Sequence, residues 1–185
     1  KGYNLSPVGK SYIAGLLKYA PEFCAVTNQF VNSYKRLVPG YEAPVYITWA
    51  RRNRSAMVRV PMYKPGKEVA TRVELRSPDP SANPYLAFAV MLGAGLKGIE
   101  EGLTLMPEAT NNIFHMTEEE LEAAGIQTLP KDLGEAIARF EGSELMKDVL
   151  GEHIHSFFVA NKKAEWSEYV ATVTAWEQDK YLSIL

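Results

Sequence analysis

A five-residue stretch, Arg72-Val73-Glu74-Leu75-Arg76, alternates charged and apolar side chains. Residues two apart in a β-strand share a face of the sheet, so the alternation predicts a strand with two apolar residues on a core and three charged residues opposite. Spacing alone leaves two interpretations of the charged face. It is either a salt-bridge ladder on an exposed strand, or a carboxylate that holds a cation beside arginines that hold anions, as nucleotide chemistry requires.

Two earlier segments, 45–50 and 57–61, also predict strands because they are rich in valine and aromatic residues. We therefore expect antiparallel strands near 45–50, 56–61 and 72–77. Asn83 can cap a helix that has Pro84 at its first position, and from there the chain reads as mainly helical. The predicted class is α+β, with the 185 residues forming one domain whose strands lie in 1–101 and whose helical region is 102–185.

The helical pattern carries further expectations. Ser11–Ala20 is predicted as a helix that Pro21 ends. The segment Glu152–Leu182 has no glycine or proline and would span about 45 Å as one helix. Thr117–Glu120 reads as a capping box before a short helix. Within the helix after Asn83, the large apolar residues are expected to face the core: Tyr85, Phe88, Leu92, Leu96 and Ile99.

Positive charge is concentrated in one part of the chain. The whole sequence has a net charge of −2, yet Lys35–Arg76 contains ten basic and three acidic residues. Seven of the ten are arginine, which is favoured where planar groups must bind carboxylates or phosphates. The block is either a solvated basic face or an anion-binding site. Glu42 lies beside it, in a loop delimited by Pro39 and Pro44.

Several protein classes are disfavoured by what the sequence contains. The longest nearly unbroken apolar run, Ala87–Leu96, is about half of a membrane span, so no membrane association is expected. The single cysteine, Cys24, excludes an intramolecular disulfide and fits a reducing cytosol, where it would be a buried apolar residue. We find no P-loop and no dinucleotide-binding glycine pattern.

Three ordered segments resemble bacterial-type glutamine synthetase. The stretch 32–44, Asn-Ser-Tyr-Lys-Arg-Leu-Val-Pro-Gly-Tyr-Glu-Ala-Pro, resembles the flap of that family. The stretch 52–61 and the stretch 72–86 resemble its next two motifs. The similarity is strongest over Thr27–Ile99, and 176–182 resembles the end of the family's sequences. The chain therefore resembles the C-terminal part of the catalytic domain.

This resemblance implies an ATP-dependent ligase that makes glutamine from glutamate and ammonia through γ-glutamyl phosphate. Glu74 would be a ligand for Mg²⁺ or Mn²⁺. Glutamate would be bound by Arg36, Arg76, Arg54 and Glu42, and nucleotide by Arg54, Arg59 and Arg72. The catalytic residues would be Glu42, which closes over the intermediate and helps deprotonate ammonium, and Arg54, which reaches the transferring phosphoryl group.

The resemblance also implies a cytoplasmic homo-oligomer, dodecameric in the family, that takes part in nitrogen metabolism. The segment alone would lack the missing N-terminal part and is expected to be inactive. Two departures stand out. Extra residues at Met62–Thr71 leave Lys64 and Lys67 as candidates for a nucleotide-contacting lysine. Phenylalanine at 114 replaces the tyrosine that some relatives adenylylate, which argues against that regulation.

Two other functions remain open. A related ligase could join glutamate to a different amine, although the anionic Glu42 suits ammonium better than a bulkier amine. A non-catalytic anion-binding module would instead show basic residues among exposed aromatics. The acids placed between the arginines disfavour that module, and nucleic acid is not an expected partner.

Overall fold

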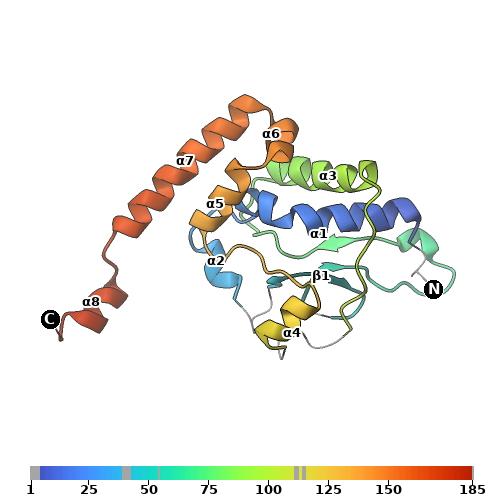
Figure 1. The fold of residues 1–185 in the computed structure, drawn as a ribbon, viewed down its shortest axis with the longest axis horizontal. Helices are drawn as coiled ribbons and strands as arrows, with labels where there is room; N and C mark the ends of the chain where they lie inside the picture. The colour runs from blue at the N-terminus through green and yellow to red at the C-terminus, as the bar shows by residue number, and fades with distance from the viewer. Residues whose placement is uncertain (1–4, 39–42, 54, 111–112, 114–115, 185) are drawn as a thin grey trace.

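The computed structural model describes residues 5–184, except 39–42, 54, 111–112 and 114–115. Its architecture is α+β, as predicted. Two long helices, α1 (Pro7–Thr27) and α3 (Pro84–Glu100), pack side by side, and α1 lies between α3 and a small sheet (Figure 1). The other helical elements are α2 (Ser33–Arg36), a 3-10 turn (Glu68–Ala70), α4 (Glu118–Ala123), α5 (Leu133–Glu141), α6 (Glu144–Leu150), α7 (Glu152–Ala171) and α8 (Ala175–Tyr181).

The sheet has three short strands in the order β1 (Tyr46–Ala50), β2 (Ala56–Arg59) and β3 (Glu74–Leu75). The β2–β3 pair is antiparallel, as predicted, with Val58 opposite Leu75 and Arg59 opposite Glu74. All five residues of β1 are buried. The free edge of β1 is covered by residues 127–129, since the backbone N–H of Ile47 donates to Gln127 and that of Leu129 donates to Val45.

The prediction of an antiparallel β1–β2 pair is wrong, because these two strands run parallel. Tyr46 pairs with Ala56 and Ala50 pairs with Arg59, with an irregularity between them. Strands adjacent in sequence usually form hairpins, but a hairpin needs a tight turn of suitable residues. Here Asn53 accepts hydrogen bonds from the N–H and hydroxyl of Ser55, and this local loop leads the chain back beside the start of β1.

Pro21 does not end the first helix, which continues to Thr27. Proline removes one helical hydrogen bond and normally breaks the element. The apolar face nevertheless continues past it, since Leu16, Ala20 and Phe23 are each no more than 2% exposed. Burial of this face compensates for the lost hydrogen bond, which local sequence rules do not take into account.

Helix α3 begins at Pro84 with Asn83 as its cap, as predicted, but it buries the opposite face from the one expected. The large residues are exposed: Tyr85 84%, Phe88 68%, Leu92 53% and Leu96 53%. The buried residues are mostly small, namely Ala87, Ala94, Gly95 and Gly98, together with Val90. The reason is the close approach of α1, since a Cβ atom on Gly98 would lie 2.5 Å from the Cα of Gly15.

The C-terminal segment is two helices and not one. Helix α7 spans about 30 Å and ends before Thr172. Thr174 then caps α8 in a reciprocal capping box with Glu177, which separates the two helices. No residue of α8 is buried, and the helix lies away from the core in Figure 1. Across the described ranges, no helix is both long and apolar enough to cross a membrane.

The backbone contact between α1 and α3 generates a stability prediction. Gly98→Ala should destabilise the fold by about 1–3 kcal/mol, because the added methyl group would overlap the α1 backbone. Gly9→Ala in α1 is the matched control, since its Cβ would come no closer than 3.4 Å to Ser6 and alanine favours helices. Chemical unfolding measures both. Equal stability of the two variants would contradict the packing described above.

Candidate anion-binding site

Glu74 lies at the centre of a charged cluster with two arginines. One carboxylate oxygen of Glu74, Oε1, accepts a hydrogen bond of 3.2 Å from Nη2 of Arg59 and lies 3.3 Å from Nη2 of Arg72. The other oxygen lies 2.8 Å from Nε of Arg59, although this contact lacks hydrogen-bond geometry. The Glu74 side chain is 31% exposed, so the cluster borders on solvent.

The cluster forms as the sequence predicts, although β3 covers only Glu74–Leu75 and is shorter than the predicted strand near 72–77. Arg59 and Glu74 are directly opposite in the β2–β3 pair, and the Arg72–Glu74 ion pair confirms that these two side chains share a face. Val73 and Leu75 pack against the core on the other side. Both sequence interpretations of the charged face remain compatible with the geometry, because a salt-bridge ladder and a ligand site use the same side chains.

Arg76 continues the β3 backbone pairing beyond the strand. Its N–H donates to the carbonyl of Met57 at 2.9 Å, and its Nη1 donates to the carbonyl of Ala56 at 3.1 Å. The next residue, Ser77, accepts a 2.6 Å hydrogen bond at its carbonyl from Nη2 of Arg36. The end of β3 and the end of α2 therefore meet at this corner, which brings Arg36 next to the segment that carries Arg76.

The loop after Ser77 is attached to the end of α1. The N–H of Asp79 donates to the carbonyl of Thr27 at 2.8 Å, and Gln29 Nε2 donates to the carbonyl of Ser81 at 2.9 Å. Burial raises the pKa of Asp79, but hydrogen bonds from Ser81 and Ser33 and the charge of Arg36 together outweigh it and leave that pKa below its usual range. The corner is therefore a rigid junction of α1, α2 and the 77–81 loop.

Two buried donors at this junction have no hydrogen-bond partner among the described residues. They are Nε of Arg36 and the hydroxyl of Ser77. Buried polar groups in folded proteins are nearly always satisfied, so such atoms call for a ligand, a water molecule or another part of the chain. Unlike Arg59 and Arg72, Arg36 forms no ion pair within the described ranges.

The remaining predicted residues divide into two groups. Glu42 and Arg54, to which the sequence analysis assigned catalysis, lie outside the described residues, as does the phenylalanine at 114. Lys64 and Lys67 are exposed around the 3-10 turn. Among the described residues, neither lysine forms an ion pair with Glu74. Sequence reasoning also missed Asn28, a fully buried residue that accepts a hydrogen bond from Arg36. The signal available was a polar Thr-Asn pair after an apolar helix face.

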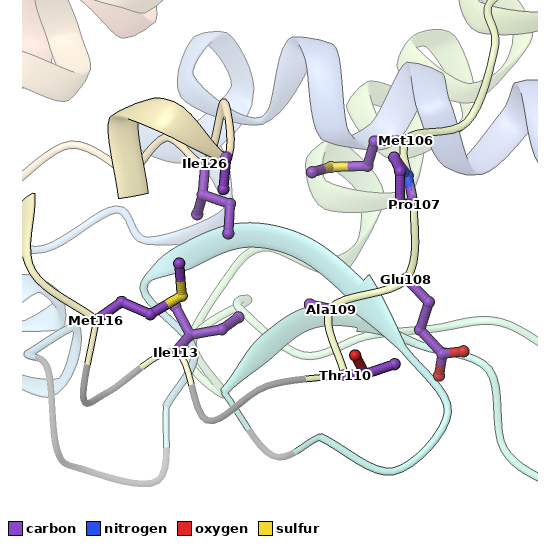
Figure 2. A pocket seen from close by; sticks show the side chains of 9 residues that line it. Met106, Pro107, Glu108, Ala109, Thr110, Ile113, Met116 and Ile126 are labelled. Atoms are coloured by element: carbon purple, nitrogen blue, oxygen red, sulfur yellow. The ribbon is translucent and has the colours of Figure 1, made fainter. Parts of the chain in front are cut away.

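A separate hollow of about 280 Å³ lies beside β1 and was not predicted (Figure 2). It is lined mainly by apolar side chains such as Met106, Met116 and Ile126. The carboxylate of Glu108 points away from these side chains and accepts a 2.9 Å hydrogen bond from the N–H of Arg51. None of the lining residues belongs to the predicted site.

Cys24 is 1% exposed, in agreement with the expectation of a buried apolar residue. Burial raises the pKa of its thiol to about 12, so the thiolate that reacts with disulfide reagents is scarce near neutral pH. We predict no reaction of the folded chain with a chromogenic aromatic disulfide near pH 8, and one equivalent of reaction after unfolding. Rapid labelling of the folded chain would contradict this burial.

Comparisons with known proteins extend this description. The sequence model described as glutamine synthetase, catalytic domain, matches residues 1–181. The glutamine synthetases of Mycolicibacterium smegmatis and Mycobacterium tuberculosis are 53% and 54% identical to the chain over 181 residues, and that of Methanosarcina mazei is 52% identical over 182. Each alignment covers 98% of this chain but only 40% or 41% of the relative.

Solved structures agree with the sequence relatives. A GmaS/ADP complex matches with a TM-score of 0.85 at 35% identity, over 99% of this chain and 41% of that one. A structure of apo GmaS without ligand matches with a TM-score of 0.80 at 34% identity, over 98% of this chain and 40% of that one. The helix pair and the small sheet define an α+β fold, and the matching sequence model describes it as part of a catalytic domain. The chain belongs to the glutamine synthetase family, and it spans about 40% of the length of the curated relatives.

Proposed function

We propose that residues 1–185 form the C-terminal part of the catalytic domain of an ATP-dependent glutamate–ammonia ligase, which makes glutamine through γ-glutamyl phosphate. One observation carries the proposal. Strand β3 carries Glu74, which pairs with two arginines, and leads directly to the corner at Ser77, where Arg36 has a buried donor without a partner among the described residues. Phosphoryl transfer depends mainly on positioning and on charge stabilisation, which arginines and metal ions provide. Membership in the glutamine synthetase family supports the same reaction.

Arg36 and Arg76 are proposed to bind the carboxylates of glutamate. Support comes from the corner at Ser77, where the two segments meet, and from the two buried donors that lack a partner there. Arginine presents a planar set of donors that matches a carboxylate. An amino acid substrate bound here would lie beside the charged strand that carries Glu74.

Glu74 is proposed to be one ligand of a Mg²⁺ or Mn²⁺ ion, with Arg59 and Arg72 contacting nucleotide phosphates. A carboxylate flanked by arginines suits a bound phosphate and its metal ion, since phosphate oxygens bind both. Among the described residues no three His, Cys, Asp or Glu side chains form a group that could hold a metal ion. Glu74 therefore contributes a single carboxylate, and phosphate oxygens together with residues elsewhere would supply the remaining ligands.

Glu42 and Arg54 are proposed as the catalytic residues of this reaction. Arg54 would stabilise the transferring phosphoryl group. Glu42 would help deprotonate ammonium and close over the intermediate, since an acyl phosphate must be kept from water. Both roles are carried by the resemblance of 32–44 and 52–61 to the family motifs.

The full-length enzyme, meaning a chain of the relatives' length that carries residues 1–185, is proposed to be a cytoplasmic homo-oligomer whose substrates are glutamate, ammonia and ATP. The exposed apolar residues of α3 and α8 fit further contacts with the rest of the chain or with neighbouring subunits. Large apolar surfaces of this kind are uncommon on isolated monomers.

A ligase that uses another amine remains the second candidate, because the residues proposed to bind glutamate and phosphate would serve either amine. Comparing ammonia with a primary alkylamine as the acceptor in the full-length enzyme separates the two candidates. A non-catalytic anion binder is disfavoured, since Glu74 neutralises two of the arginines such a module would use.

Glu74→Gln tests the metal role directly. The amide keeps the shape but loses the charge, so the full-length enzyme should bind Mn²⁺ and ATP more weakly, by about tenfold or more. Because the ion pairs are partly exposed, the loss of stability should not exceed about 1 kcal/mol. Titration calorimetry measures the affinities.

Glu68→Gln is the matched control, since this exposed acid lies in the 3-10 turn and is not part of the Glu74 cluster. Its affinities should match those of the unmodified enzyme. Unchanged Mn²⁺ affinity in Glu74→Gln would show that the cluster is only a salt-bridge ladder.

A further inference from the structure

Asn28 is a fully buried amide at the end of α1, and its orientation is determined by its neighbours. Its backbone N–H donates to the carbonyl of Cys24 at 2.8 Å. Its side-chain Nδ2 donates to the hydroxyl of Thr27 at 3.1 Å and lies 3.6 Å from the sulfur of Cys24. Acceptors therefore surround the nitrogen end of the amide, and the oxygen end is left for a donor.

That donor is Arg36. Its Nη2 donates to Oδ1 of Asn28 at 3.2 Å and to the carbonyl of Ser77 at 2.6 Å. Both hydrogens of this nitrogen are thus engaged, which holds the guanidinium plane between α1 and the end of β3. The Nε of the same guanidinium is buried with no hydrogen-bond partner among the described residues.

Both acceptors that hold Arg36 are electrically neutral. An amide oxygen and a carbonyl oxygen orient the guanidinium without cancelling its charge. Within the described ranges no carboxylate forms an ion pair with Arg36. The charge of Arg36 does help to lower the pKa of the neighbouring Asp79, but Oδ1 of Asp79 accepts hydrogen bonds from the N–H and hydroxyl of Ser81 and none from Arg36. This differs from Arg59 and Arg72, whose charges are matched by Glu74.

We infer that Asn28 is a positioning residue, which holds Arg36 through a neutral acceptor so that the full positive charge of Arg36 is presented to a carboxylate of the substrate. This inference rests on the proposed function, in which Arg36 binds glutamate. An arginine that is held in place loses less conformational freedom on binding, and an arginine without a directly paired carboxylate attracts the incoming carboxylate more strongly. Asparagine satisfies both requirements, whereas aspartate would satisfy only the first.

Asn28→Asp in the full-length enzyme separates positioning from support of the fold. The substitution keeps an oxygen acceptor and the buried volume, but it places a carboxylate on Arg36. We expect the KM for glutamate to rise by about 10- to 100-fold, the range that a hydrogen bond to a charged group implies, while the KM for ATP changes less than about twofold. Asn28→Ala should also raise the KM for glutamate, because the guanidinium loses one acceptor.

Gln29→Ala is the matched control. Gln29 is the next residue and bonds the same loop through the carbonyl of Ser81, but it does not contact Arg36. It should leave both KM values unchanged. A double-substitution cycle with Arg36→Lys completes the test, since residues that act through one another are not additive. Asn28→Asp combined with Arg36→Lys should bind glutamate no more weakly than Arg36→Lys alone.

The outcomes that contradict the inference are distinct. An unchanged KM for glutamate in Asn28→Asp would overturn it, and so would an equal rise in the KM values for glutamate and ATP, which indicates general disruption. Multiplying effects in the double variant would show that Asn28 does not act through Arg36. If Arg36→Lys alone leaves the KM for glutamate unchanged, the proposed substrate role of Arg36 fails, and this inference fails with it.

Discussion

The backbone contact between α1 and α3 determines where the charged residues of this segment lie. Gly15 and Gly98 let the two helices approach so closely that no side chain fits between them at that point. The end of α1 then holds the 77–81 loop through Thr27 and holds Arg36 through Asn28. Since that loop connects β3 with α3, its contacts with the end of α1 fix the path of the chain from the strand that carries Glu74 to α3.

Local sequence patterns predict much of this fold, but they fail where contacts between residues far apart in the sequence determine which face is buried. The α+β class, the Asn83-Pro84 helix start and the β2–β3 pairing follow from periodicity and capping. The buried face of α3 could not be predicted, because hydrophobicity favours burying Phe88 and Leu92 whereas close packing against α1 selects small residues. Pro21 is tolerated inside α1 because the buried apolar face of the helix continues past it. The break before α8 was predictable, since Thr174 and Glu177 have the spacing of a capping box.

The candidate site was likewise predictable only in part. Alternation in a strand predicts that Arg72 and Glu74 share a face, and their ion pair agrees. The polar Thr27-Asn28 pair after an apolar helix face marks Asn28 in the sequence, but its role could not be predicted, because it depends on a hydrogen bond to Arg36. The contrast between neutralised and unneutralised arginines likewise exists only in three dimensions. This contrast indicates two different roles: Arg59 and Arg72 act together with Glu74, whereas Arg36 attracts an anion by itself.

The central claim is that this segment supplies one side of a composite ligase site. The most direct test is ATP-dependent glutamine formation by the purified 185-residue chain with Mg²⁺ or Mn²⁺, measured beside the full-length enzyme. A single carboxylate, Glu74, cannot by itself fix the metal ions that bridge ATP and glutamate, so the account predicts no detectable glutamine from the segment. Turnover approaching that of the full-length enzyme would contradict it, because the residues named here would then be sufficient for the reaction.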